Sequence, residues 1–218
     1  MKRRQKHTRD AAGSRQAILE AAEKTFAAHG FHGARVERIA QAAGVAKGTV
    51  FLHFQDKENL LFALVEHRAG TFQQLYASLA KSDRSARERL EELADVHKWM
   101  RNDLLEFRRM MMSLWPTLPA GLRKRLHEFV RRTHTLMRDR VADLYRELLG
   151  SGGIDGSGPE ELAAALLACV DGLTMRLHVP APVPAAAAVS RAAKLAFIYN
   201  LERRAAQARK NGERKPKP

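Results

Sequence analysis

The chain contains a single cysteine, Cys169, among its 218 residues. A lone cysteine excludes an internal disulfide framework and a structural zinc site built from cysteine ligands. Apolar runs are short, and the longest, residues 162–170, ends at Asp171. Because a membrane-spanning helix needs about 20 apolar residues, we predict no span and no membrane partner. The basic N-terminus leads into no hydrophobic stretch, so we expect no signal peptide and a soluble cytoplasmic protein.

The motifs of the common enzyme classes are also missing. The sequence has no phosphate-cradling glycine loop, no nucleophile elbow, no HExxH and no carboxylate pair at a telling spacing. Four histidines, His97, His127, His134 and His178, are scattered without the spacing of metal ligands. We therefore predict a protein that is not an enzyme and that has no cofactor and no metal site.

Acidic residues are scarce relative to basic ones, with 24 Asp and Glu against 38 Lys and Arg, and the net charge is +14. The excess lies at the two ends, because residues 1–57 carry +6 and residues 203–218 carry another +6. Such segregation indicates polyanion binding, to nucleic acid first and to an anionic membrane surface second. A short basic tail can also do no more than keep a chain in solution. Both interpretations stay open for residues 211–218, which we expect to be disordered.

Strand patterns are missing as well, because Val, Ile and Thr never alternate with polar residues, while Ala, Leu, Arg and Glu dominate. The hydrophobic periodicity predicts an all-α protein of about nine helices, three in the basic head and about six in the remainder. We expect helices over residues 14–29, 36–43, 47–54, 56–80, 85–101, 103–114, 119–149, 159–177 and 185–210. The stretch 85–114 fits either one long helix or two consecutive ones.

Several helix boundaries carry recognisable residues. Ser14 and Asp56 can cap the helices that follow them, and Pro159 suits the first position of a helix. Gly30 and Gly33 are expected to end the first helix and open a turn. A glycine-rich loop up to residue 158 and a stiff, extended proline-rich segment at residues 180–184 are expected to separate the last helices.

Residues 39–50 have the spacing of a helix-turn-helix. Ala40 is small enough for two short helices to cross closely, and Gly44, four positions later, tolerates the positive φ that the turn needs. Ile39, Val45 and Val50 are then expected to pack between the helices. The start of the second helix would project toward a DNA major groove. This spacing alone also fits an ordinary helical hairpin.

A longer pattern surrounds this core motif. It reads Val36-x2-Ile39-Ala40-x2-Ala43-Gly44-Val45-x2-Gly48-Thr49-x3-His53-Phe54-x2-Lys57-Glu58-x-Leu60. Over residues 14–62 the chain resembles the DNA-binding domain of the TetR family of transcriptional regulators. The resemblance implies a basic arm over residues 1–13, a helix-turn-helix domain over 14–56, and an effector-binding and dimerisation domain over 57–210. For the arm, a contact with the DNA minor groove and a disordered, solvated tail both stay open.

The resemblance also implies individual DNA contacts. Thr49 matches the family threonine at the DNA-facing end of the recognition helix, and Gly48 beside it allows close approach to the DNA backbone. Lys47 stands where a base or a phosphate is contacted. Lys57 matches the lysine that holds a phosphate at the start of the fourth helix. His53 matches the end of the motif.

Four positions depart from the family pattern. Ala46 stands where Ser or Thr is usual, so the recognition helix lacks a side-chain cap that is worth about 1 kcal/mol. Phe51 replaces the usual tyrosine and removes a phenol that could bond a phosphate. Leu52 indicates apolar contact with a thymine methyl group. Arg35, where a small hydroxyl residue is common, is expected to contact a phosphate. The predicted DNA-binding set is Arg35, Lys47, Gly48, Thr49, Phe51, Leu52, His53 and Lys57.

Six of the seven methionines and both tryptophans lie between residues 99 and 175. Methionine is pliable and suits an irregular apolar cavity, although such residues at helical spacing also fit a plain core. We predict a pocket for a small apolar or amphipathic effector. Its expected lining is Trp99, Met100, Phe107, Met111, Trp115, Met137, Cys169 and Met175.

The segment 162–173 is apolar nearly all round, so it must be buried on more than one face. Its Asp171-Gly172-Leu173 triplet resembles the penultimate helix of the family, which pairs with the last helix across a two-fold axis. A plain core helix is the alternative. The predicted dimer interface consists of Leu166, Val170, Leu173, Val189, Ala193, Phe197 and Leu201.

Together these features predict a sequence-specific, ligand-responsive transcriptional repressor that binds a palindromic double-stranded DNA operator as a homodimer. An activator, or a regulator that responds to a protein partner, stays open. The alternative from a different class is a non-specific architectural DNA-binding protein that uses the two basic ends. Such a protein would bind random duplex with a steep salt dependence and no preferred site.

Overall fold

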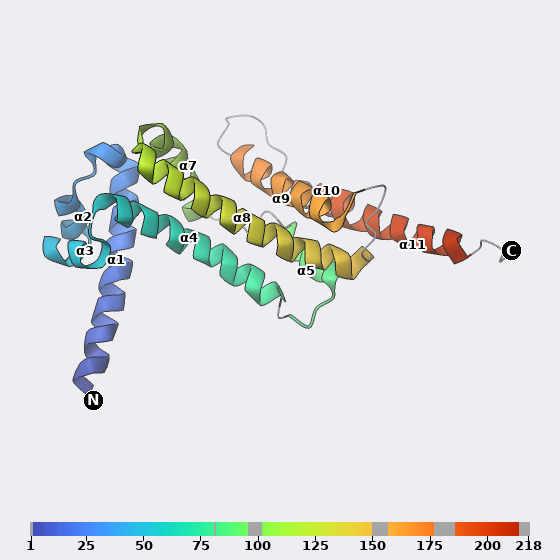
Figure 1. Cartoon of the computed structure of the whole chain (residues 1–218), viewed down its shortest axis with the longest axis horizontal. Helices are drawn as coiled ribbons and strands as arrows, with labels where there is room; N and C mark the ends of the chain where they lie inside the picture. Colours follow the sequence, from blue (N-terminus) through green and yellow to red (C-terminus); the bar gives the residue numbers. More distant parts are fainter. Residues whose placement is uncertain (1, 81, 96–101, 150–156, 177–185, 214–218) are drawn as a thin grey trace. The chain divides into compact units, whose positions relative to one another are not determined.

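The computed structural model describes residues 2–80, 82–95, 102–149, 157–176 and 186–213 (Figure 1). Every regular element in these residues is helical, which confirms the predicted all-α fold. The N-terminal helices are α1 (Lys2–Gly33), α2 (Val36–Ala42), α3 (Lys47–Phe54) and α4 (Lys57–Ala80). Then follow α5 (Ala86–Leu93), α7 (Asn102–Leu114), the 3-10 turn η1 (Trp115–Thr117), α8 (Ala120–Leu149) and α9 (Pro159–Arg176). The last stretch is α10 (Ala186–Lys194), the π-helical segment η2 (Leu195–Tyr199) and α11 (Asn200–Glu213).

The first helix begins earlier than predicted. It begins at Lys2, so the expected cap at Ser14 is wrong, and residues 2–13 are helical instead of forming a disordered tail. These residues include lysine, arginine, glutamine and alanine, all good helix formers, and no proline interrupts them. At the other end the prediction is confirmed. Gly30 takes the non-helical φ 69° and ψ 175° and breaks α1, and the short helical piece after this break ends at Gly33.

Two other predicted helix starts are confirmed. The Asp56 carboxylate caps α4 by accepting a hydrogen bond from the backbone N–H of Asn59 at 2.7 Å, and Pro159 is the first residue of α9. The stretch 85–114 is not one continuous helix, because α5 ends at Leu93 and α7 begins at Asn102, and residues 96–101 between them lie outside the described residues. Residues 150–156 and the proline-rich segment 180–184 lie outside the described residues.

The chain divides into two compact units that do not follow the predicted boundary between residues 56 and 57. The first unit consists of Met1–Phe72 and Glu106–Arg131, and the second of Gln73–Leu105 and Arg132–Pro218. The three helices of the basic head therefore share one unit with part of α4, most of α7 and about the first two-fifths of α8. The helix-turn-helix thus shares its hydrophobic core with parts of α4, α7 and α8.

The core of the first unit explains this fusion. The α1 residues Ile18, Leu19, Ala22 and Phe26 lie on one face of the helix and are almost completely buried. Side chains from the other head helices and from α4, α7 and α8 join the same cluster. The buried partners include Ile39, Val50, Phe54, Leu60, Leu61, Leu64, Phe107, Met110, Leu114, Leu122 and Leu126. Burial of this apolar surface joins the head helices to α7 and α8.

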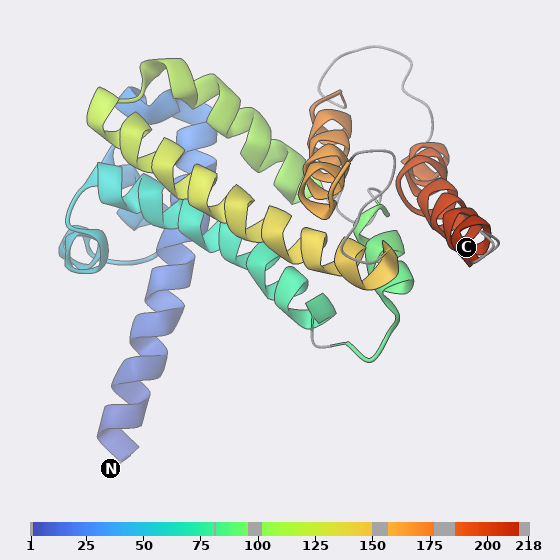
Figure 2. The same ribbon diagram turned by 45° about the vertical axis from the view of Figure 1, so that its right-hand side comes forward.

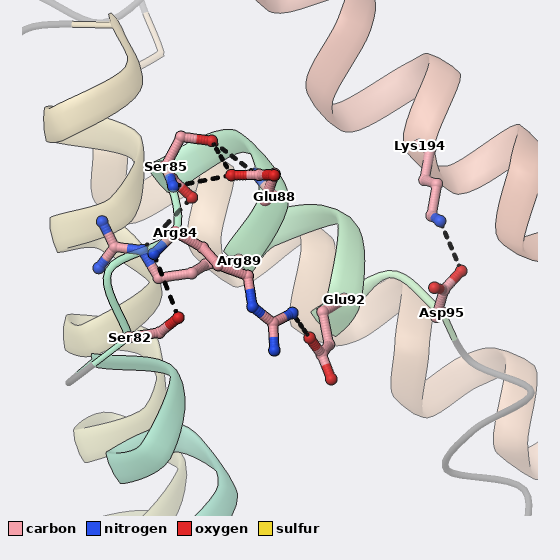
Figure 3. A network of polar contacts seen from close by, with 8 residues as sticks. All are labelled: Ser82, Arg84, Ser85, Glu88, Arg89, Glu92, Asp95 and Lys194. Atoms are coloured by element: carbon pink, nitrogen blue, oxygen red, sulfur yellow. Dashed lines mark hydrogen bonds and ion pairs between the residues drawn. The ribbon is translucent and has the colours of Figure 1, made fainter.

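The second unit has its own core, in which Tyr145 is completely buried. Polar contacts hold α5 in this unit (Figure 3). The Ser85 hydroxyl accepts from the backbone N–H of Glu88 at 3.3 Å, and the Glu88 carboxylate accepts from the backbone N–H of Ser85 at 2.9 Å. This reciprocal capping box begins α5. Just beyond the helix, Asp95 forms an ion pair with Lys194 of α10 at 2.6 Å.

The last helical stretch continues as one rod through its π-helical segment (Figure 2). Ile198 and Ala193 are buried in the second core, and Phe197 and Leu201 pack against it. The Tyr145 hydroxyl donates to the Phe197 carbonyl oxygen at 2.9 Å, which fastens the rod to α8.

Tyr145→Phe is expected to lower the free energy of unfolding by about 1 kcal/mol, because it removes this hydrogen bond and leaves a shielded carbonyl without it. The benzene ring still fills its place in the core, so the surface exposed on unfolding should not change. Urea denaturation measures this as a lower midpoint with an unchanged slope. An unaltered midpoint would mean that the hydroxyl does not hold the last helix.

Candidate DNA-binding interface

The helix-turn-helix geometry predicted from the spacing is confirmed. Gly44 takes φ 68° in the turn, and Ala40 is buried where α2 and α3 meet. The backbone N–H of Val45 donates to the Ala40 carbonyl at 3.0 Å and closes the turn. Ala46 precedes α3 in an extended conformation and its side chain offers no cap. The missing cap is thus also confirmed, and the first amides of α3 have no side-chain acceptor at the cap position.

The recognition helix α3 divides sharply into a core side and a solvent side. Val50 and Phe54 are buried, whereas Leu52 is 83% exposed and Phe51 is 40% exposed. The other predicted DNA-binding residues of this helix are at the surface or half-buried, namely Lys47, Gly48, Thr49 and His53. Folding alone gives no reason to leave an apolar side chain as open to water as Leu52. The arrangement therefore presents polar and apolar groups together on one small helix.

Lys47 is not free on this surface. Its ammonium forms an ion pair with Glu37 of α2, with 2.5 Å between Nζ and Oε1, and lies 5.6 Å from the centre of the Phe51 ring. The hydrogen bond from Lys47 is the largest cause of a lowered pKa at Glu37. Sequence analysis missed Glu37, because a separation of ten residues across a turn does not reveal that two side chains meet.

Lys57 faces inward more than the resemblance implies. Its ammonium donates to the carbonyl oxygens of Ala34 at 3.1 Å and His32 at 3.3 Å, and lies 4.7 Å from the centre of the Phe31 ring. Burial lowers the pKa of this ammonium. Since two of its three N–H donors are engaged, Lys57 fastens the end of α1 to the start of α4. Its contact with a DNA phosphate stays a prediction that rests on the third donor.

Two arginines flank Glu37. Arg35 occupies the position before α2, where its side chain is exposed and makes no capping hydrogen bond. Arg38, which sequence analysis did not single out, is also exposed, and its guanidinium donates to Nε2 of His29 at 2.5 Å. The surface around the start of α2 is therefore rich in positive charge, as a surface that meets phosphates requires.

Polar contacts inside the first unit connect the head to α7 and η1. Arg68 of α4 pairs with Glu23 of α1 at 2.6 Å, with both side chains mostly buried, and its guanidinium lies 5.7 Å from the Phe107 ring centre on α7. The His32 ring N–H donates to the Thr117 carbonyl in η1 at 2.7 Å. Helices α1, α4 and α7 are therefore mechanically linked.

The predicted effector-pocket residues divide between the two units. Phe107, Met111 and Trp115 belong to the first unit, where Phe107 is buried and Trp115 is exposed. Met137 and Cys169 are half-buried in the second unit, and burial raises the pKa of the Cys169 thiol. The remaining three, Trp99, Met100 and the side chain of Met175, lie outside the described residues. The pocket stays a prediction.

An open hollow of about 390 Å³ lies along the last helix and includes none of the predicted pocket residues. Its lining is Ala196, Asn200, Leu201, Arg203 and Arg204, a polar and basic set that does not fit an apolar effector.

The predicted dimer interface stays a prediction, and two of its residues have little exposed surface. Leu166 is 1% exposed and Ala193 is 3% exposed within a single chain, because both pack in the core of the second unit. Residues already buried in this way have little surface left for a partner. Val170, Phe197 and Leu201 are half-buried against the same core. The side chains of the other two, Leu173 and Val189, lie outside the described residues.

Within the described residues, no three His, Cys, Asp or Glu side chains gather as a metal site would require. In the same part of the chain, no helix combines the length and the apolar character needed to cross a membrane.

Two family models match the chain. Residues 18–64 match the bacterial regulatory proteins of the tetR family, and residues 103–197 match the C-terminal region of BetI-type transcriptional repressors. The chain belongs to the TetR family. The first match contains the whole helix-turn-helix, and the second extends from α7 into the π-helical segment.

Curated relatives of this TetR-family chain match it mainly through the head. The HTH-type transcriptional repressor AcnR of Corynebacterium glutamicum is 52% identical over 56 residues, which are 26% of this chain and 30% of that protein. The chain thus matches less than a third of the length of this relative.

Solved structures extend the likeness to most of the chain. A transcriptional regulator from Pseudomonas aeruginosa has a TM-score of 0.70 and 22% identity, over 87% of this chain and 90% of that one. FadR from Bacillus subtilis, in complex with stearoyl-CoA, has a TM-score of 0.65 and 21% identity, over 84% and 97% of the two chains. At this level of identity the likeness shows a shared fold.

Proposed function

We propose that this TetR-family chain is a sequence-specific DNA-binding repressor that binds a palindromic operator as a dimer and releases it when a small ligand binds. The observation that carries the proposal is the solvent side of α3, where Lys47, Thr49 and the largely exposed Leu52 lie on a helix whose other side is buried. A short helix that presents donors and an apolar side chain beyond the body of the head suits the major groove.

The residues divide between base reading and positioning. Lys47 and Thr49 are suited to donate to base edges, and Leu52 and Phe51 to contact thymine methyl groups. Arg35 provides an exposed guanidinium for a phosphate at the start of α2. Gly48 leaves room for the DNA backbone, His53 borders the contact surface, and the third donor of Lys57 is directed to a phosphate. Phosphate contacts fix the register, whereas the base contacts carry the sequence information.

Dimerisation is proposed through the outward side of α9 and the last helical stretch. Ala164 and Ala168 are exposed on α9, and Leu195 is 53% exposed on the π-helical segment, beside the exposed Ala196. Small side chains allow close approach of helices from two protomers, and Leu195 supplies an apolar anchor. Three half-buried residues of the dimer interface that the sequence predicts would border this contact, namely Val170, Phe197 and Leu201. A two-fold axis then places two heads about one or more DNA turns apart.

The effector is proposed to be a small apolar or amphipathic compound. FadR, which shares the fold, is in complex with stearoyl-CoA, an amphipathic ligand. The links from Arg68 to Glu23 and from His32 to Thr117 support a route by which a shift of α7 or η1 moves the head. Release of DNA requires that the ligand favour the non-binding arrangement by a coupling of about 1–3 kcal/mol. A catalytic role is not part of this proposal, and turnover of a substrate by the purified protein would contradict it.

The test of this function is selection of duplexes bound by the purified protein from a random pool. We expect a palindromic sequence whose half-sites lie about one helical turn, or a multiple of it, apart. Binding to this sequence should exceed binding to random duplex by about 1,000-fold or more. Recovery of no common sequence, together with steep salt dependence on every duplex, would support the architectural DNA-binding protein and contradict the repressor.

A further inference from the structure

Glu37 is an acidic residue on a surface that otherwise suits DNA. It is the only acidic residue between Glu23 and Asp56 in the sequence. It lies in the first turn of α2, between the exposed Arg35 and Arg38 and against Lys47 of the recognition helix. A carboxylate in this position adds nothing to phosphate binding and offsets one of the neighbouring positive charges. Its presence therefore calls for a compensating role.

The contact with Lys47 provides such a role. Both side chains are more than half exposed, at 52% for Lys47 and 60% for Glu37, so the ion pair has little value for folding. Coulombic attraction from Lys47 and Arg35 adds to the Lys47 hydrogen bond in lowering the Glu37 pKa, so the carboxylate is charged at neutral pH. The pair holds the Lys47 ammonium beside the Phe51 ring, over the solvent side of α3.

We propose that Glu37 is a specificity-determining residue, which holds the Lys47 ammonium at the recognition surface and withholds it from phosphates of non-operator DNA. This inference rests on the proposed function. An ammonium has three donors, so Lys47 can keep its bond to Glu37 and still donate to a base edge that lies above α3. On random DNA the base acceptors are absent from that place, and Lys47 gains a partner only by leaving Glu37 for a phosphate. The ion pair thus lowers the affinity for non-operator DNA and leaves the affinity for the operator nearly unchanged.

Glu37→Gln tests the inference, because it keeps the size of the side chain and removes its charge. We expect affinity for random duplex to rise about fivefold and the salt dependence on random duplex to steepen by about one phosphate contact. Operator affinity should change less than about twofold, so the ratio of operator to random binding should fall by a comparable factor of about five. Fluorescence anisotropy titrations with the selected operator and with random duplex, at several salt concentrations, measure both affinities.

Two further variants separate this effect from a general change of charge. Glu66→Gln removes the same charge from an exposed position on α4 and should leave the operator-to-random ratio unaltered. In a Lys47→Ala background, Glu37→Gln should no longer raise random-duplex affinity beyond the Glu66→Gln control. A wild-type ratio in Glu37→Gln would overturn the inference. An equal gain with and without Lys47 would also overturn it, because Glu37 would then act on phosphates directly.

Failure of the proposed function gives a different result. A wild-type protein with no preferred site contradicts the repressor, whatever the Glu37 variants do. In that case, the effect of Glu37→Gln on random-duplex affinity, measured with and without Lys47, still tests the inference. A gain that requires Lys47 supports the withholding of this lysine by Glu37, and a gain that does not require it overturns the inference.

Discussion

Replacement of both Lys47 and Thr49 by alanine removes most of the preference for the operator over random duplex. Lys47 is exposed and Thr49 is half-buried on α3, and a base contact is worth about 1–3 kcal/mol, or about 5- to 150-fold in affinity for each single variant. Loss of both contacts should remove most of the preference for the operator, since Phe51 and Leu52 read only methyl groups.

Both single variants should act mainly on the operator. Because Glu37 holds the Lys47 ammonium away from the phosphates of random DNA, Lys47→Ala should leave the affinity for random duplex within about twofold of the wild type. Electrophoretic mobility shifts on the selected operator and on random duplex measure the two affinities.

The matched control is Lys24→Ala, which removes the same positive charge from an exposed position on α1. It should leave operator binding within about twofold of the wild type, because a surface charge away from the contact contributes little beyond long-range attraction. Circular dichroism should show wild-type helix content in all variants. If Lys47→Ala and Thr49→Ala both bind the operator as the wild type does, α3 is not the recognition helix.

Leu195→Arg converts the dimer into monomers and lowers operator affinity by about 100-fold or more, because the two heads no longer bind as one linked pair. Leu195 is 53% exposed on the outward side of the last helical stretch. In a two-fold interface an introduced arginine would be desolvated without a partner and would lie near its own symmetry mate. Sedimentation velocity measures the change in mass directly.

Leu136→Arg is the control for this prediction, because it makes the same substitution at an exposed leucine of α8 in the same unit. We expect that variant to remain a dimer and to bind the operator normally. Phe197→Arg is a poorer test, because Phe197 packs against the second core and its effect would combine misfolding with dissociation. A Leu195→Arg protein that sediments as a dimer would remove this face from the interface.

The local features of the head were predictable from sequence because their causes are local. Gly44 is needed for a positive φ, Asp56 caps the helix that begins one residue later, and Ala46 supplies no cap. The burial of Ile39 and Val50 follows from the periodicity of two short helices. These causes act within a few residues, so the helix-turn-helix and the family could be inferred from the chain alone.

Contacts between segments could not be inferred in this way. Lys57 has the same sequence context whether its ammonium faces a phosphate or the carbonyls of Ala34 and His32. Leu166 and Ala193 have the apolar character of an interface, but the chain's own α5 and α8 bury them first. Sequence periodicity identifies an apolar face and does not say which surface covers it.

By itself, then, the sequence determined the all-α class, most helix boundaries, the helix-turn-helix and the TetR family, because each depends on propensity, capping and short-range spacing. The tertiary structure decided that the head shares a core with α7 and α8, that Lys57 faces inward, and that Glu37 meets Lys47. These outcomes depend on which distant side chains come within a few ångströms of each other. That proximity is set by the packing of the whole unit.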